Sequence, residues 1–139
     1  MSDAALLATF CDFYNTFSAA WLPRLPELYA PDFTFTDPFH TIRADFPALR
    51  AYFEKVLKLP MSKFTTEDTA TGADGSYVRW RWDYKLFKGS DVRTAPGVTQ
   101  LRLRGGKIAF HQDHFDAAST VLEGIPVIGG AIRLVKSRM

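Results

Sequence analysis

The spacing of hydrophobic residues divides the chain into a helical part and a strand-rich part. In residues 1–60, apolar side chains recur every three or four positions, which is typical of amphipathic helices. This pattern predicts a first helix capped by Ser2 or Asp3, a second over Pro23–Tyr29, and a third that begins at Asp45 and stops near Pro60.

From Lys63 onward, apolar and polar residues alternate as they do in strands. The predicted strands are Phe64–Ala70, Tyr77–Phe87, Val98–Leu103 and Ile108–Phe115. The alternation is clearest in the second, where one face holds Val78, Trp80, Trp82, Tyr84 and Leu86. Helices followed by an antiparallel meander predict one α+β domain over residues 1–139. Its cone-shaped, curved antiparallel sheet would wrap around the N-terminal helices and enclose a pocket on its concave side.

The segment Phe33–Phe39, between the second and third predicted helices, carries the first candidate chemistry. After a turn at Ala30–Asp32, alternation puts Phe33, Phe35 and Asp37 on the same side of a short strand, which Pro38 ends. A carboxylate among aromatic rings is poorly solvated, so we expect Asp37 to transfer protons near neutral pH. The alternative is an Asp-Pro turn in which Asp37 is solvated or accepts backbone hydrogen bonds.

The last predicted strand carries a second group of ionisable residues. Alternation places His111, Asp113 and Phe115 on one face, so His111 and Asp113 are predicted to form an acid/base pair. A purely structural hydrogen bond between them is the alternative. His40 is expected at the mouth of the pocket, and Asp116 is expected to cap the turn that follows the strand.

Composition excludes several classes of function. A net charge of +2, with basic and acidic residues interspersed, argues against nucleic-acid binding. Cys11 is the single cysteine, so a reducing compartment is expected, and no His spacing typical of a metal site occurs. No basic, apolar leader opens the chain and no apolar run approaches the ~20 residues of a membrane span. We therefore expect a cytoplasmic protein with no cofactor, no metal and no membrane partner.

Several stretches resemble the nuclear transport factor 2-like superfamily, which includes ketosteroid isomerase, SnoaL-type polyketide cyclases and limonene-epoxide hydrolase. The matching stretches are Phe13-Tyr14, Leu28-Tyr29-Ala30-Pro31-Asp32, Phe35-Thr36-Asp37-Pro38-Phe39, Leu49-Arg50-Ala51-Tyr52-Phe53, Gly106-Lys107-Ile108 and His111-Gln112-Asp113-His114-Phe115-Asp116. The resemblance spans nearly the whole chain. It implies the cystatin-like α+β barrel of this superfamily and a homodimer.

The resemblance also implies roles for individual residues. Asp37 stands where the isomerase has its general base, and Tyr14 lies on the helix of its oxyanion-hole tyrosine. Thr99 replaces the isomerase's second oxyanion donor, and Asp113 matches an acid/base aspartate of the hydrolase and the cyclases. The predicted catalytic residues are therefore Asp37, Asp113, His111 and Tyr14. The predicted substrate contacts are Phe33, Phe35, Phe39, His40, Trp80, Trp82, Thr99 and Phe115.

Three functions follow, in order of preference. The first is a cofactor-free isomerase or cyclase that moves a proton on a small apolar or cyclic carbonyl compound. The second is a non-catalytic ligand-binding or dimerisation module of the same fold. The third is an epoxide hydrolase, which needs the pair Arg81 and Asp83 in the pocket. Alternation instead places that pair on the solvated face, where we expect contacts with Arg102 or Arg104.

Overall fold

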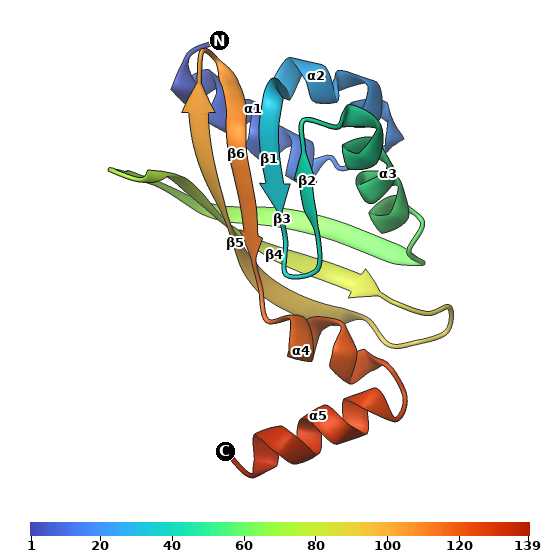
Figure 1. Ribbon diagram of the computed structural model, residues 1–139. Helices are drawn as coiled ribbons and strands as arrows, with labels where there is room; N and C mark the ends of the chain where they lie inside the picture. Colours follow the sequence, from blue (N-terminus) through green and yellow to red (C-terminus); the bar gives the residue numbers. More distant parts are fainter.

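The computed structural model describes residues 1–139. Its N-terminal half is mainly helical (Figure 1). Its helices are α1 (Asp3–Asn15), the 3-10 helix η1 (Ala19–Arg24), α2 (Leu25–Leu28) and α3 (Phe46–Leu57). Both predicted caps are confirmed: Ser2 Oγ accepts a hydrogen bond from the Ala5 amide at 3.1 Å, and Asp45 Oδ1 accepts one from the Ala48 amide at 3.0 Å. The predicted helix over residues 23–29 is confirmed in part, because α2 covers residues 25–28, but residues 23–24 belong to η1 and Tyr29 already belongs to a strand.

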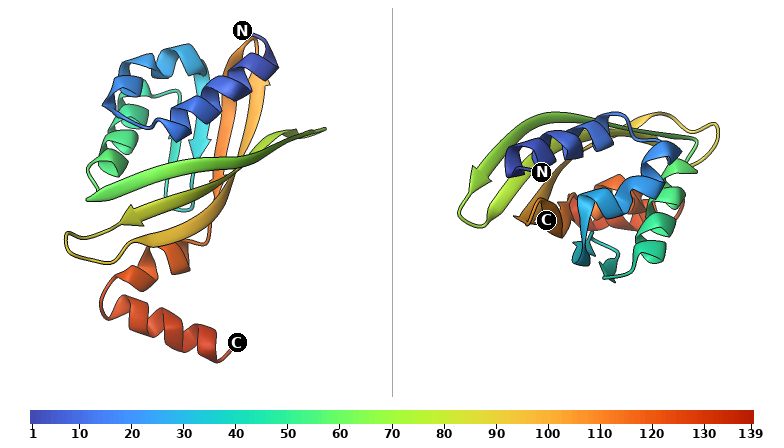
Figure 2. Two further views of the ribbon diagram at one scale, coloured as in Figure 1. Left: turned by 180° about the vertical axis from the view of Figure 1, so that it is seen from behind. Right: turned by 90° about the horizontal axis from the view of Figure 1, so that it is seen from above.

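One six-stranded sheet carries the rest of the domain. The strands are β1 (Tyr29–Thr36), β2 (Thr41–Arg43), β3 (Met61–Gly72), β4 (Gly75–Lys85), β5 (Arg93–Arg104) and β6 (Lys107–His114). Their order is β2-β1-β6-β5-β4-β3, and only β1 and β6 run parallel. The sheet curves around α1, α2 and α3, which lie on its concave side (Figure 2), but it does not close into a barrel. The α+β fold with a curved sheet is confirmed.

The strand bounds differ from the prediction at their polar ends. β3 and β5 extend beyond the predicted segments, and β2 was not predicted, because its residues are few and partly exposed. Pro31 lies inside β1 rather than in a turn. The pairing of β1 with β6 shifts register between Tyr29 and Thr34, and such an irregularity tolerates the missing amide hydrogen of proline.

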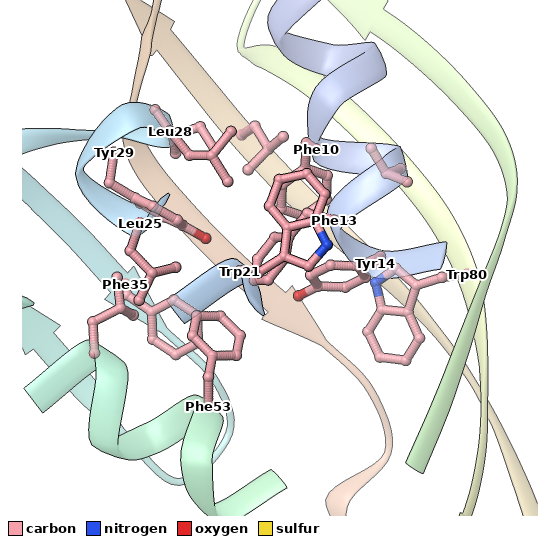
Figure 3. Close-up of a cluster of buried hydrophobic side chains, with 14 of the residues drawn as sticks. Phe10, Phe13, Tyr14, Trp21, Leu25, Leu28, Tyr29, Phe35, Phe53 and Trp80 are labelled. Carbon is pink, nitrogen blue, oxygen red and sulfur yellow. The ribbon is translucent and has the colours of Figure 1, made fainter. Parts of the chain in front are cut away.

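The core fills the space between the helices and the sheet. The alternation predicted for β4 is confirmed, since Val78, Trp80, Trp82 and Tyr84 are all buried. They belong to a cluster of 20 buried hydrophobic residues that also includes the aromatic face of α1 (Figure 3). Most aromatic side chains therefore pack in the core, and few remain to border a cavity.

The chain ends in a helical segment below the sheet. It consists of α4 (Ala117–Thr120), the 3-10 helix η2 (Leu122–Gly124) and α5 (Ile128–Ser137). Asp116 caps α4 as predicted, accepting a hydrogen bond from the Ser119 amide at 3.1 Å. The Tyr84 hydroxyl donates to the Thr120 carbonyl, which anchors α4 to β4, whereas α5 packs chiefly against η2. None of the helices has both the length and the apolar character needed to cross a bilayer.

Candidate functional site

The parallel pairing of β1 with β6 brings the two candidate aspartates together. Phe35 pairs with His111 and Thr36 with Gln112, so the same register, continued by one residue, sets Asp37 beside Asp113. Both aspartates are 7% exposed. Their surroundings nevertheless differ, because Asp113 lies within the core and Asp37 lies in a turn at the end of β1.

Asp113 belongs to a buried hydrogen-bonded group that we call the inner cluster: Tyr14, Tyr29, Thr99, His111 and Asp113. Asp113 Oδ1 accepts a hydrogen bond from the Thr99 hydroxyl at 2.5 Å and lies 2.8 Å from His111 Nε2. The Tyr14 hydroxyl donates to Asp113 Oδ2 at 3.2 Å. Trp80 Nε1 donates to Thr99 Oγ1 at 2.8 Å, so the hydrogen of the Thr99 hydroxyl is directed to Asp113.

His111 completes the inner cluster and is fully buried. Its Nδ1 lies 2.8 Å from the Tyr29 hydroxyl, and its ring packs on that of Phe35 at a centroid distance of 4.5 Å. If Nε2 donates to the Asp113 carboxylate, Nδ1 accepts from Tyr29, and each donor then has an acceptor. This assignment makes His111 neutral and Asp113 an ionised acceptor of three donors. It agrees with the structural alternative for the His111–Asp113 pair.

The tyrosines of the inner cluster are held in their neutral form. Burial raises the pKa of Tyr14 and Tyr29 well above 10, and the nearby Asp113 carboxylate raises both further. Both phenols therefore act as hydrogen-bond donors over the physiological pH range. Every buried side-chain nitrogen and oxygen in the chain has a hydrogen-bond partner, so the inner cluster leaves none unpaired.

A cavity of about 210 Å³ lies next to the inner cluster, and Asp37 borders it. Its walls come from the turn after β1, from α3, from the end of β4 and from the segment that leads into α4. The lining residues are Asp37, Phe39, His40, Tyr52, Lys55, Val56, Leu59, Trp82, Leu86, Phe115 and Val121. The lining is largely apolar, and its polar groups gather around Asp37.

The two oxygens of Asp37 are bound differently. Oδ1 accepts hydrogen bonds from the backbone amides of Phe39 at 2.8 Å and His40 at 2.6 Å. His40 Nδ1 lies 3.0 Å from Oδ1 and 3.2 Å from Oδ2, and no backbone amide donates to Oδ2. Asp37 therefore fits both interpretations of the sequence: its carboxylate lies in an aromatic surrounding, and it accepts backbone hydrogen bonds in an Asp-Pro turn. Its Oδ2 oxygen keeps the capacity to accept another proton.

Tyr52 is a further cavity residue that the sequence analysis did not select. Its ring packs against Phe35 at a centroid distance of 4.7 Å and against His40 at 5.3 Å. Burial raises its pKa well above 10, and the Asp113 and then the Asp37 carboxylates raise it further. Tyr52 is therefore a neutral donor near both aspartates. The available signal was its helical spacing with Val56, an apolar residue one turn later in the same predicted helix.

The structure separates the predicted site residues into two groups. Asp37, Phe39, His40, Trp82 and Phe115 border the cavity. The others lie in the inner cluster or the core: Tyr14, His111, Asp113, Thr99, Phe33, Phe35 and Trp80. Their proposed contact with substrate stays a prediction.

The pair that epoxide hydrolysis requires lies away from the cavity. Arg81 Nε is 3.4 Å from Asp83 Oδ2, and Asp83 also accepts a hydrogen bond from Thr94 at 2.6 Å. The contacts expected with Arg102 or Arg104 are wrong, because Arg102 pairs with Asp74 and Arg104 with Asp32. No three His, Cys, Asp or Glu side chains converge as a metal site requires.

Comparisons with known proteins agree with this architecture. Residues 11–111 match the family model of the SnoaL-like domain. The chain belongs to this family. A search of the curated proteins finds no match.

Solved structures show the same fold at low sequence identity. A candidate SnoaL-like polyketide cyclase from Jannaschia sp. CCS1 is 15% identical, with a TM-score of 0.70, over 84% of this chain and 86% of that one. A protein with a ketosteroid isomerase-like fold from Catenulispora acidiphila, in complex with trimethylamine, is 16% identical, with a TM-score of 0.70, over 84% and 88%. AclR, a candidate hydroxylase from Streptomyces galilaeus, is 16% identical, with a TM-score of 0.67, over 96% and 92%.

Proposed function

We propose that this SnoaL-like protein is a cofactor-free isomerase or cyclase that moves a proton on a small apolar or cyclic carbonyl compound. The observation that supports it is a carboxylate at the edge of an apolar cavity, with one oxygen fixed by two backbone amides and the other free of backbone donors. A cavity of about 210 Å³ favours a compact compound, because it is smaller than the pockets that hold drug-sized ligands.

The proton transfer needs only groups that this chain supplies. Asp37 removes a proton from the carbon next to the carbonyl group, and the electron pair of that C–H bond moves onto the carbonyl oxygen. A hydrogen bond from the Tyr52 hydroxyl stabilises the resulting enolate. Asp37 then returns the proton to a different carbon in an isomerisation. In a cyclisation, the enolate carbon instead attacks a second carbonyl group, whose oxygen takes the proton. Neither route changes the oxidation state of the substrate.

The predicted catalytic residues of the inner cluster have a supporting part in this proposal. Asp113, together with His111 and Tyr14, would be the second acid/base group. It is adjacent to Tyr52, whose hydroxyl lies close enough to both aspartates for each to raise its pKa. Asp113 would therefore act on the substrate through Tyr52.

Exchange of carbon-bound hydrogens tests the chemistry without a known substrate. Cyclic ketones that quench the fluorescence of Trp82, a cavity residue, would be incubated with the protein in D₂O, and loss of their α-proton signals would be followed by NMR. We expect Asp37→Asn to slow the exchange by about 10²–10⁴-fold, the usual contribution of a general base. Asp68→Asn is the matched control, because Asp68 is exposed and bonds only to the neighbouring Thr69 amide.

The rival function is a non-catalytic ligand-binding module. The observation that favours it is that Asp113 does not line the cavity and already accepts hydrogen bonds from Tyr14, Thr99 and His111. If a ketone quenches Trp82 fluorescence equally in the wild type and in Asp37→Asn while the exchange rates are also equal, the cavity binds ligands and the catalytic proposal fails.

A further inference from the structure

Helix α5 and the segment before it form an apolar groove on the surface. The groove has a volume of about 600 Å³, and its lining residues are Ala118, Leu122, Val127, Ile128, Ala131, Ile132, Val135, Lys136 and Met139. Val127 is 88% exposed and Val135 is 61% exposed. Exposed apolar side chains in such number on one short segment indicate a surface that is covered in use.

The arrangement of α5 is that of an amphipathic helix with basic edges. At about 100° per residue, Ile128, Ile132 and Val135 fall within roughly 60° of one another around the axis of α5. On the same helical wheel, Lys136 follows one edge of this apolar stripe and Arg138 follows the other. Long basic side chains at the edges of an apolar stripe can bury their stems and keep their charges in a polar layer.

The charges of the segment identify what could cover it. After Glu123 the chain carries Arg133, Lys136 and Arg138 and no acidic residue. Lys136 lies 3.4 Å from Glu123, and Arg133 donates to the Glu123 carbonyl, whereas Arg138 has no acidic partner. The acids of this segment, Asp116 and Glu123, already pair with Lys136, so packing this face against a second copy would bring the two Arg138 side chains to the interface without acids to pair them. An anionic partner would instead meet complementary charge.

The position of α5 allows contact with an extended surface. The helix lies at one end of the molecule, beyond α4 and away from the sheet (Figures 1 and 2), and packs chiefly against η2. A helix of 10 residues is marginally stable in water by itself, so burial of its apolar stripe would stabilise it.

We propose that α5 docks the protein onto the surface of a bilayer that contains anionic phospholipids. The apolar stripe would enter the boundary between headgroups and acyl chains, and the basic side chains at its edges would contact the phosphate groups. This revises the expectation of no membrane partner, which rested only on the absence of a spanning segment. The proposal is independent of the chemistry in the cavity.

Cosedimentation of the full chain with vesicles tests the docking. We expect wild-type protein to bind vesicles of phosphatidylglycerol and phosphatidylcholine but not vesicles of phosphatidylcholine alone, and to be released by salt. Arg138→Gln should weaken binding by about five-fold, the usual effect of one basic residue near an anionic surface. Val135→Asn should weaken it by about ten-fold through lost apolar burial.

Two control variants change one basic and one apolar residue elsewhere on the surface. Arg43 is exposed on β2 and Phe87 is exposed after β4, so Arg43→Gln and Phe87→Ser should bind vesicles like the wild type. Failure of the wild type to bind anionic vesicles overturns the proposal, as does equal binding to both vesicle types. If Val135→Asn instead converts a dimer into a monomer by light scattering and vesicle binding is absent, the face is an interface between two copies.

Discussion

Replacing Thr99 by valine tests whether the inner cluster holds the fold together. The change keeps the size of the side chain but removes two hydrogen bonds. One is donated by Thr99 to Asp113 at 2.5 Å, and the other is accepted from Trp80 Nε1 at 2.8 Å. Thr99 is fully buried and Trp80 is 1% exposed, so water cannot replace either bond.

The size of the effect follows from these two losses. A hydrogen bond to a charged group contributes roughly 1.5–3 kcal/mol, and a buried N–H without a partner costs roughly 1–3 kcal/mol. The unfolding free energy of Thr99→Val should therefore fall by about 3–5 kcal/mol. A domain of this kind is stable by about 5–15 kcal/mol, so a measurable fraction of that stability remains.

Urea unfolding, followed by tryptophan fluorescence and circular dichroism, measures this difference. The matched control is Thr94→Val on the same strand, because Thr94 also donates to an aspartate, Asp83, at 2.6 Å, but at the surface. The control should lose less than about 1 kcal/mol. Equal losses in Thr99→Val and Thr94→Val would refute the view that burial makes the inner cluster stabilising.

Two further predictions concern packing and pH. A Cβ at Gly97 would lie 2.2 Å from the Trp80 ring, so Gly97→Ala should displace the indole and lower the unfolding free energy by about 1–3 kcal/mol. Gly130 has open space around it, so Gly130→Ala should be neutral or stabilising. Thermal melts measure both effects. Because burial raises the pKa of Tyr14 and Tyr29 above 10, the stability they contribute is fully present below the unfolded pKa near 10 and is lost as pH rises through their folded pKa. Tyrosinate absorbance should therefore show these two residues ionising together with unfolding, and their ionisation near pH 10 in folded protein would contradict the reasoning.

The sequence predicts well which side of a strand faces the core, because burial of one side requires apolar residues at every second position. His111 and Asp113 were placed together by alternation alone, and the structure shows both buried on one face of β6. Ser2, Asp45 and Asp116 were recognised as caps because a cap depends on residues within a few positions. Local signals of this kind carry information about local structure.

The sequence could not reveal what depends on contacts between distant segments. The parallel pairing of β1 with β6 joins residues about seventy-five positions apart in sequence, and neither strand carries a signal for its partner. The same limit explains why Tyr52 was missed. Its position on α3 shows that it faces inward, but only the packing of α3 beside the end of β1 sets it near Asp37.

The two aspartates show why a single pattern cannot assign roles. Hydrogen bonds from side-chain donors offset the energetic cost of burying the Asp113 carboxylate. A substitution of Asp113 should therefore alter folding as well as any activity. Asp37 is held by the amides of Phe39 and His40, which are fixed by the turn and reach only Oδ1. A proton acceptor must lie within reach of the ligand, and Asp37 borders the cavity whereas Asp113 does not. Alternation identified both carboxylates as buried, and three donors reach each one, so it is the cavity bordered by Asp37 and not by Asp113 that separates their roles.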